Sequence, residues 1–338
     1  MQYLCTKKTD KFMKKILGMG NALTDILLQL ENDDQIISLN MPKGSMQLIS
    51  EQQSASIGEL FGNYEKKMAT GGSASNTING ITKLGATAGF VGKVGKDSVG
   101  DFFTNDSVSN GVTPHLTLSQ TPSGHCTVLV SPDGERTLCT FLGAACELEA
   151  DEITPEMFEG YDIFHIEGYL VQNHDLIRKA VSLAKAAGLD VSIDLASYNV
   201  VESNLDFLNE IIENYVDIVF ANEDEARAFT GLEPLESVNE ISQKVKIAVV
   251  KIGKNGSFLK SGNESISVKP YLANCIDTTG AGDLYAAGFL YGLACNYPLE
   301  ICGKIGSLVS ANVVEVLGAK MTNDVWEKIQ LEIKEIIA

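Results

Sequence analysis

Short apolar runs alternate with longer helical patterns through most of the chain, and this alternation limits the possible folds more than any other feature. The runs are "KILGMG" near residue 15, "TAGFVGKVG" near 87, "YDIFHIEG" near 161, "DVSIDLA" near 190, "VDIVFAN" near 216 and "KIAVVKIG" near 246. Several are almost continuously apolar, which is typical of strands covered on both faces. Helical patterns such as 173–188, which ends at Gly188, lie between them. The alternation predicts an α/β protein with a doubly wound, mostly parallel sheet.

Two segments break the alternation. Residues 24–45 and 112–145 have the patterns of strands without intervening helices, and Asp133-Gly134 predicts a hairpin turn in the second. From the residues alone, a small separate sheet covering a site and an edge extension of the main sheet are equally consistent with these segments. A length of 338 residues with 44% hydrophobic content fits one large domain with such an appendage.

Charge and cysteine content exclude several classes of function. The formal net charge of -18 disfavours nucleic acid and anionic membranes as partners, so a phosphate ligand would need local geometry to hold it. The seven cysteines form no CxxC pair, which fits a reducing cytoplasm, and no signal core or bilayer-length apolar run is present.

Met13 with Lys14 and Lys15 reads as a second start, so residues 1–12 are expected to be a dispensable extension before a domain at 13–338.

The stretch "DTTGAGD", residues 277–283, precedes a helical pattern of small and apolar residues. Gly280, Ala281 and Gly282 would present backbone amides at the helix start, where the helix dipole also attracts anions. Asp283 in the first turn is a candidate catalytic base, since a loose phosphoryl-transfer transition state needs only a weak base. The alternative is a glycine turn with an acid that only stabilises the helix.

Two common nucleotide-binding motifs are not met. "GMGNALTD" has Leu23 where the dinucleotide fingerprint GxGxxG requires glycine. In "FVGKVGKD", Phe90 stands at the first glycine of a P-loop and Asp97 at its serine or threonine. A nicotinamide-dependent dehydrogenase and a P-loop NTPase are therefore disfavoured.

Three further stretches carry candidate ligand-binding residues. In "ATGGSASNT", Gly72 precedes a helix with Asn76, whose amide can donate to and accept from a hydroxyl, although an ordinary helix start fits as well. Asn222 and Glu225 follow an apolar strand and could hold Mg²⁺ through water or simply cap a helix. Lys251 could contact a phosphate or be a solvated lysine beside a turn.

The order of these stretches carries more information than any one of them. "GMGNALTDI", "GGSASNT", "FVGKVGKDSVGDFF", "NEDE", "KIGKNG", "DTTGAGD" and "SANVVEVLGA" follow one another along the chain. In this order the chain resembles the ribokinase or PfkB family of carbohydrate and nucleoside kinases. The resemblance runs from about Met13 to beyond Gly318, and "DTTGAGD" is its most specific part.

The resemblance implies a Rossmann-like three-layer α/β/α sandwich with a small β-sheet lid at about 24–45 and 112–145. It implies transfer of the γ-phosphoryl group of ATP, with Mg²⁺, to a hydroxymethyl group of a sugar or nucleoside. The roles implied by position are catalytic base for Asp283; anion hole for Gly280, Ala281 and Gly282; substrate binding for Asn21, Asp25, Gly72 and Asn76; Mg²⁺ for Asn222 and Glu225; nucleotide binding for Lys251, Gly253, Gly256 and Asn312; and a K⁺ site for Asp277 and Thr279.

Other stretches, "SPDGERTLCTFLGAACEL", "MPKGSMQLIS" and "IEGYLVQ", resemble the adenosine-kinase-like branch and favour adenosine as acceptor. A free sugar such as ribose or fructose remains the alternative, and so does a non-catalytic nucleotide or sugar sensor on the same fold. Within the lid, Arg136 either reaches a phosphate on closure or pairs with Glu135 or solvent. The chain is expected to act as a monomer or homodimer.

Overall fold

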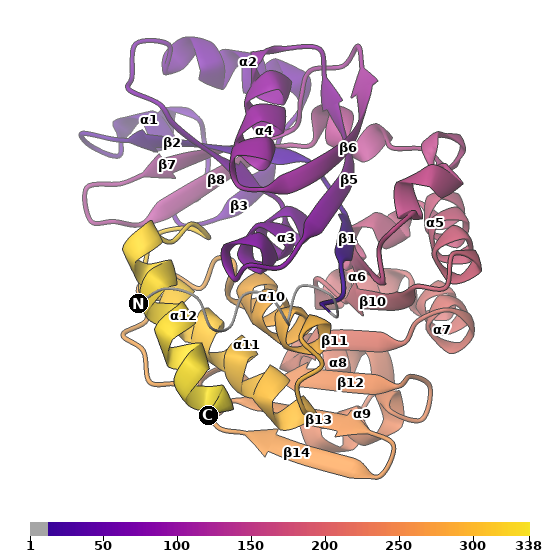
Figure 1. The fold of residues 1–338 in the computed structure, drawn as a ribbon. Coiled ribbons are helices and arrows are strands. Elements are labelled where there is room, and N and C mark those ends of the chain that lie inside the picture. The colour runs from indigo at the N-terminus through magenta and orange to yellow at the C-terminus, as the bar shows by residue number, and fades with distance from the viewer. Residues whose placement is uncertain (1–12) are drawn as a thin grey trace, which may run out of the picture.

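The computed structural model describes residues 13–338, so the expected extension at 1–12 lies outside the described residues. Within residues 13–338, one sheet of nine strands and one of five strands organise the fold (Figure 1). The larger sheet is the centre of a body in which helices cover both faces. The smaller sheet lies at one end of the molecule with two short helices of its own.

The larger sheet is parallel over most of its width. Seven neighbouring strands pair in parallel, whereas the two strands at one edge pair antiparallel. The spatial order is β14 (Glu264–Val268), β13 (Ser257–Ser261), β12 (Ile247–Lys251), β11 (Ile218–Asn222), β10 (Asp190–Asp194), β9 (Ile163–Glu167), β1 (Ile16–Met19), β5 (Ala88–Gly95) and β6 (Val112–Ser119). The six predicted runs form β1, β5, β9, β10, β11 and β12, which confirms the predicted sheet.

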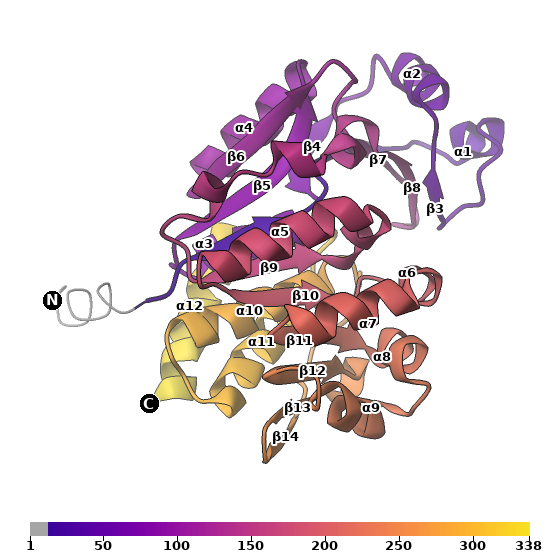
Figure 2. The same cartoon turned by 90° about the vertical axis from the view of Figure 1, so that its right-hand side faces the viewer.

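Helices cover the two faces in separate layers (Figure 2). One layer contains α3 (Ser73–Lys83), α10 (Ala281–Ala294), α11 (Leu299–Val313) and α12 (Asn323–Ile337). The other contains α5 (His174–Ala186), α6 (Tyr198–Ser203), α7 (Leu205–Asn214), α8 (Glu223–Thr230) and α9 (Pro234–Ile241). In β1, Ile16 joins the first core and Leu17 the second, and both are fully buried. Burial on both faces explains the continuous apolar runs and confirms the three-layer architecture.

One further helix and several 3₁₀ turns complete the body. Helix α4 (Ser98–Ser109) packs against β5 and β6, and the side chain of Asp97 caps it by accepting from the amides of Val99 and Gly100. The 3₁₀ turns are Gly143–Glu147, Ala150–Glu152, Pro155–Phe158, Gly168–Gln172 and Gly253–Asn255. Among residues 13–338, none of the helices has both the length and the apolar character needed to cross a bilayer.

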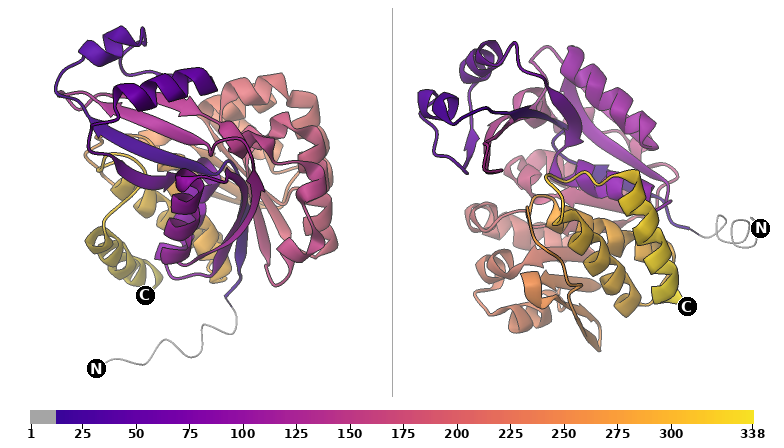
Figure 3. Two further views of the ribbon diagram at one scale, coloured as in Figure 1. Left: turned by 90° about the horizontal axis from the view of Figure 1, so that it is seen from above. Right: turned by 90° about the vertical axis from the view of Figure 1, so that its left-hand side faces the viewer.

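The smaller sheet is built from segments far apart in the sequence. Its order is β3 (Met46–Leu48), β8 (Arg136–Phe141), β7 (His125–Val130), β2 (Leu23–Gln29) and β4 (Lys67–Gly71). Strands β7 and β8 form a hairpin around Asp133-Gly134, as the sequence predicts. Helices α1 (Asp34–Ser38) and α2 (Glu51–Leu60) accompany this sheet, and in Figure 3 the indigo segment that holds them projects from the body.

The limits of this small sheet differ from the expected segments 24–45 and 112–145. Strand β6 (Val112–Ser119) pairs with β5 and belongs to the main sheet, because its whole length is in parallel register with that strand. The first segment extends to Gly71 through β3, α2 and β4, and it contains α1, where the sequence pattern indicated strands alone. Strand β4 closes one edge by antiparallel pairing with β2.

Close packing of α10 on α11 makes the fold sensitive to one glycine. A Cβ atom on Gly288 would lie 2.8 Å from the carbonyl oxygen of Ile305 and 2.9 Å from the backbone of Gly306. We expect Gly288→Ala to lower the free energy of unfolding by about 2 kcal/mol in urea titrations, because the helices must move apart. The matched control is Gly58→Ala in α2, where a Cβ meets nothing within 4 Å; it should be neutral or stabilising by about 0.5–1 kcal/mol. Equal effects of the two substitutions would contradict this packing.

Candidate active site

Four neighbouring parallel strands end in polar residues. Glu167, Asp194, Asn222 and Lys251 are the last residues of β9, β10, β11 and β12. Glu167 is in register with Asp194, and Asn222 is in register with Lys251. The carboxyl edge of a parallel sheet is where open α/β proteins bind ligands. This edge is therefore the natural position for a site.

The glycine turn of "DTTGAGD" begins α10 as predicted. Gly280 has φ +77° and precedes the helix, and a Cβ atom there would lie 2.6 Å from the Cβ of Ala319. The sequence predicts that the amide of Ala281 is available to an anion. In the structure this amide instead donates to the carbonyl of Thr278 (3.1 Å). Within residues 13–338, the amides of Gly280 and Gly282 have no acceptor. Two amides, rather than three, are thus open to an anion at the positive end of α10.

Asp283 is held by the first turn of α3, more than 200 residues earlier in the chain. Its Oδ1 accepts from the hydroxyl of Ser73 (2.8 Å), and its Oδ2 accepts from the Nδ2 of Asn76 (3.0 Å). The hydroxyl of Thr77 donates to its backbone carbonyl (3.1 Å). The structure thus brings the expected base next to Asn76, an expected substrate-binding residue.

Burial raises the pKa of Asp283 to about 6 from an ordinary 3.8. Hydrogen bonds from Asn76 and Ser73 oppose the rise, and so does Lys251, whereas the negative charge of Asp194 adds to it. A carboxylate with this pKa is still ionised at neutral pH and is a stronger base than an exposed aspartate.

Asn21 is held in place by a buried carboxylate. Its backbone amide and its Nδ2 both donate to Oε1 of Glu167 (2.9 and 2.5 Å), and Oε2 accepts from the amide of Ala74 (3.0 Å). Burial raises the pKa of Glu167 to about 7. Glu167 therefore joins the end of β1 to the start of α3 and sets the position of Asn21.

Asp25 lies on β2 of the small sheet, opposite Ala69 of β4. Its carboxylate covers Gly71, where a Cβ atom would lie only 2.6 Å from Oδ1. Gly72 has φ +92°, and a Cβ atom on it would meet the carbonyl oxygen of Asn21 at 2.3 Å. Burial raises the pKa of Asp25 to about 6 against the opposing charges of Lys320 and Arg136. The four expected substrate-binding residues thus lie where β1, β2, β4 and α3 meet.

Asn222 and Glu225 form a reciprocal cap at the start of α8. Oδ1 of Asn222 accepts from the amide of Glu225 (2.8 Å), and the carboxylate of Glu225 accepts from the amide and Nδ2 of Asn222 (both 2.7 Å). The helix-cap interpretation of this motif is therefore correct at the level of local structure. Burial, with the nearby charge of Asp194, raises the pKa of Glu225 to about 7.

Lys251 is buried between carboxylates. Its Nζ donates to Oδ2 of Asp194 (2.7 Å) and would lie 3.2 Å from a Cβ placed on Gly282. Burial lowers the pKa of Lys251, but the charges of Asp194, Glu225 and Asp283 outweigh burial, so the net shift is upward. Lys251 is therefore a permanent cation next to the turn that begins α10, and not a solvated surface lysine.

Asp277 and Thr279 contact an arginine of the small sheet. A guanidinium nitrogen of Arg136 binds the carboxylate of Asp277 and donates to the hydroxyl of Thr279 (3.2 Å). Asp277 also accepts from the amides of Thr279 (2.9 Å) and Gly318 (2.8 Å). Although burial raises the pKa of Asp277, these bonds and Arg136 lower it overall. Arg136 pairs here, and not with Glu135, and a cation at these oxygens would compete with it.

The expected nucleotide-binding residues lie near β12 and in α11. Gly253 (φ +52°) begins a 3₁₀ turn and Gly256 (φ +100°) follows it, where a Cβ would meet the carbonyl oxygen of Val268 at 2.0 Å. Asn312 is buried in α11, where its Nδ2 donates to the carbonyl of Leu308 (2.9 Å) and its Oδ1 accepts from Lys328 (3.5 Å). The Gly253 turn directly follows Lys251.

Three residues of this site were not identified from the sequence. In the sequence, Ser73 lies within a glycine-rich stretch, and Glu167 and Asp194 lie within runs expected to be strands. For Glu167 and Asp194 the usable signal is a polar residue at the carboxyl end of an apolar strand. Ser73 had no such signal, because its partner is far away in the sequence.

Comparisons with known proteins identify the family of this chain. The family model for "pfkB family carbohydrate kinase" matches residues 46–326. The chain therefore belongs to the PfkB family of carbohydrate kinases, which are phosphotransferases with an alcohol group as acceptor. Kinases of this family use ATP and generally Mg²⁺.

Individual relatives include sugar and nucleoside kinases. The crystal structure of adenosine kinase from Sinorhizobium meliloti has a TM-score of 0.82 and 31% identity, covering 95% of this chain and 99% of that one. Adenosine kinase 2 of Arabidopsis thaliana is 26% identical over 90% of this chain and 94% of its own length. An uncharacterized sugar kinase of Archaeoglobus fulgidus is 28% identical over 71% of this chain and 96% of its own.

The raised pKa of Asp283 leads to a prediction about stability. Because the folded-state pKa lies above the unfolded value of 3.8, the ionised carboxylate destabilises the fold above about pH 6, and this cost disappears as the pH falls toward 4. We expect Asp283→Asn to raise the melting temperature at pH 7.5 by roughly 2–4 °C, and the gain to shrink toward pH 4. Scanning calorimetry across this range measures both effects.

The control is Asp224→Asn, which removes an exposed acid from the first turn of α8. It should change the free energy of unfolding by no more than about 0.5 kcal/mol at any pH. A lower melting temperature for Asp283→Asn at pH 7.5 would show that its hydrogen bonds outweigh its burial.

Proposed function

We propose that this kinase transfers the γ-phosphoryl group of ATP to the hydroxymethyl group of a nucleoside, with adenosine the favoured acceptor and Asp283 the catalytic base. The observation that carries the proposal is the position of Asp283. Its carboxylate lies between Ser73 and Asn76 on the side of the expected sugar-binding residues, and it follows directly after the two open amides of Gly280 and Gly282.

In the proposed reaction, Asp283 orients the acceptor hydroxyl and takes its proton. The hydroxyl oxygen forms a bond to the γ-phosphorus while the bond from that phosphorus to the bridging oxygen of ADP breaks. Because the transition state is loose, the proton leaves late, and a base with a pKa near 6 is adequate. Asp25, Gly72 and Asn76 hold the sugar so that this hydroxyl faces Asp283.

Charge that develops on the phosphoryl oxygens is stabilised by fixed groups. The amides of Gly280 and Gly282 and the start of α10 supply partial positive charge, and Lys251 next to Gly282 supplies a full one. We assign the nucleotide to the edge formed by Lys251, the Gly253–Gly256 turn and Asn312. Because these groups are already in position, they stabilise the transition state without the free-energy cost of rearrangement.

The residues present also fit Mg²⁺. Within residues 13–338, no three His, Cys, Asp or Glu side chains are arranged to hold a metal directly. However, burial and then the nearby charge of Asp194 raise the pKa of Glu225, and a divalent cation would relieve the repulsion between these two carboxylates. Asn222, Glu225 and Asp194 would hold Mg²⁺ through its waters, as this ion prefers, and it would neutralise charge on the nucleotide phosphates.

We assign the small sheet as a lid over the acceptor. Asp25 and Arg136 project from one face of this sheet toward the body, since Arg136 contacts Asp277 before α10. The Nε of Arg136 is buried without a partner among the described residues, so the guanidinium has a donor left for a ligand. A K⁺ ion would occupy the oxygens of Asp277 and Thr279 only if Arg136 withdrew.

One observation favours a nucleoside over a free sugar. The strand pairing puts Leu27, Cys126, Val128 and Leu138 on the same face of the small sheet as Asp25. Leu27 and Leu138 pack there against a small apolar cluster, and Leu138 is only half-buried. An apolar surface beside a sugar site suits the planar ring of a base, whereas a free sugar leaves it uncovered. Adenosine is also the substrate named for two of the relatives.

A screen for ADP release tests the acceptor. We expect adenosine to outperform inosine, ribose, fructose and their phosphates in kcat/KM. Leu138→Ser should raise KM for adenosine about tenfold, because the base loses apolar contact, while any turnover of ribose stays unchanged. Preference for ribose or fructose would support the free-sugar alternative. Binding of ATP and sugar without ADP formation would indicate a sensor.

A further inference from the structure

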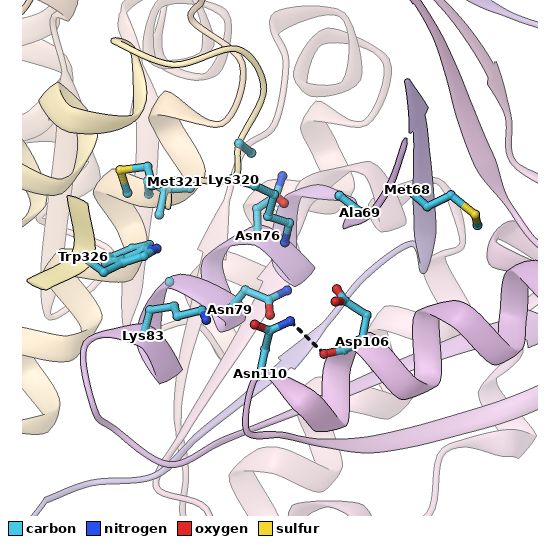
Figure 4. A pocket seen from close by; sticks show the side chains of 13 residues that line it. Met68, Ala69, Asn76, Asn79, Lys83, Asp106, Asn110, Lys320, Met321 and Trp326 are labelled. Carbon is cyan, nitrogen blue, oxygen red and sulfur yellow. Dashed lines mark hydrogen bonds between the residues drawn. The ribbon is translucent and has the colours of Figure 1, made fainter. Parts of the chain in front are cut away.

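A cavity of about 200 Å³ lies behind the acceptor site and has no place in the proposed reaction. It is lined by β4 of the small sheet, by α3 and α4, by the segment 319–321 and by α12 (Figure 4). An engineered apolar cavity of ~150 Å³ accommodates benzene, so this one has room for a small molecule. We call it the Lys320 pocket.

The polar groups of the Lys320 pocket have fixed donor and acceptor roles. The hydroxyl of Thr70 donates to Oδ2 of Asp106 (2.9 Å) and accepts from Nζ of Lys320 (3.0 Å) and Nδ2 of Asn79 (3.2 Å). Thr70 is thereby saturated. Among residues 13–338, Lys320 has no other partner, so two of its three N–H groups lack acceptors.

Two amide oxygens in the pocket lack donors. The Oδ1 atoms of Asn76 and Asn79 are buried and have no hydrogen-bond partner among the described residues. Exchanging the oxygen and nitrogen of either side-chain amide would break a hydrogen bond. Nδ2 of Asn76 donates to the carboxylate of Asp283, and Nδ2 of Asn79 donates to the carbonyl of Ser75. Buried polar atoms without partners are rare and call for a ligand or water.

The charges around Lys320 argue against an anion as that ligand. Burial lowers the pKa of Lys320 to about 8, against the attraction of Asp106, Asp25 and Asp283. The three carboxylates outnumber the two cations, Lys320 and Lys83, so the surroundings of the pocket carry a net negative charge. Unpaired N–H donors together with unpaired amide oxygens require a partner that both donates and accepts, as a hydroxyl does.

We propose that the Lys320 pocket binds a small uncharged polyhydroxylated molecule, of monosaccharide size, at a site distinct from the acceptor site. Its hydroxyl oxygens accept hydrogen bonds from Nζ of Lys320, and its hydroxyl groups donate hydrogen bonds to Oδ1 of Asn76 and of Asn79. Apolar contact comes from Met68, Met321 and Trp326 (Figure 4).

The two sites are neighbours at β4 and share one residue. Asp25 lies opposite Ala69, which lines the pocket, and the hydroxyl of the neighbouring Thr70 accepts from Lys320. Asn76 contacts Asp283 with Nδ2 and lacks a partner at Oδ1. A molecule in the Lys320 pocket would therefore hold Asn76 in the orientation that binds Asp283, and would strengthen acceptor binding.

The chain provides its own reporter for this test, because Trp326 is its single tryptophan and lines the pocket. We would titrate D-ribose and D-fructose into the full chain and follow Trp326 fluorescence. A saturable change is expected. Lys320→Met should weaken binding at least tenfold, as should Asn79→Ala if the first variant does not fold. The control Lys179→Met removes an exposed lysine of α5 and should have no effect.

Asp25→Asn separates the two sites. The change in Trp326 fluorescence should persist in this variant, since Asp25 belongs to the acceptor site. A signal lost in Asp25→Asn and kept in Lys320→Met would overturn the proposal and leave the kinase assignment intact. Absence of any saturable change, or stronger binding of inorganic phosphate than of either sugar, would also overturn it. Loss of the signal in Lys320→Met would support it even if no acceptor were phosphorylated.

Discussion

The contact between the first turns of α3 and α10 determines the rest of the site. Ser73 and Asn76 bind the carboxylate of Asp283, and Thr77 binds its carbonyl. One turn further along, a Cβ on Gly80 would meet the Cβ of Ala287 at 2.7 Å, so the helices approach as closely as glycine allows. This contact sets the distance between the groups assigned to the sugar and the base that acts on it.

The electrostatics of the site follow from the number of buried carboxylates that it brings together. Burial raises the pKa of Asp25, Glu167, Glu225 and Asp283, so each ionised carboxylate opposes folding at neutral pH. Lys251, paired with Asp194, is a buried cation near these acids, and Lys320 and Arg136 act on Asp25. A protein tolerates such an arrangement where function requires it, and Mg²⁺ with a nucleotide would relieve the repulsion.

The main sheet and the order of motifs could be predicted from sequence, because apolar runs and glycine turns are local signals. The pairing of strands could not, and this is why β6 (Val112–Ser119) was expected in the lid and is found in the main sheet. Ser73 and Lys320 could not be identified for the same reason, since their partners are distant in sequence. The hydrogen bond from the amide of Ala281 to the carbonyl of Thr278 depends on backbone geometry that no residue pattern specifies.

The most direct test of the central claim, that Asp283 is the base, is the pH dependence of kcat/KM for adenosine and ATP. The structure predicts that the activity of the natural sequence falls below an apparent pKa near 6, because protonated Asp283 cannot accept a proton. It also predicts that Asp283→Asn lowers turnover by about 10²–10⁴-fold at pH 7.5. Full turnover in Asp283→Asn, with the same fall below pH 6, would contradict the account.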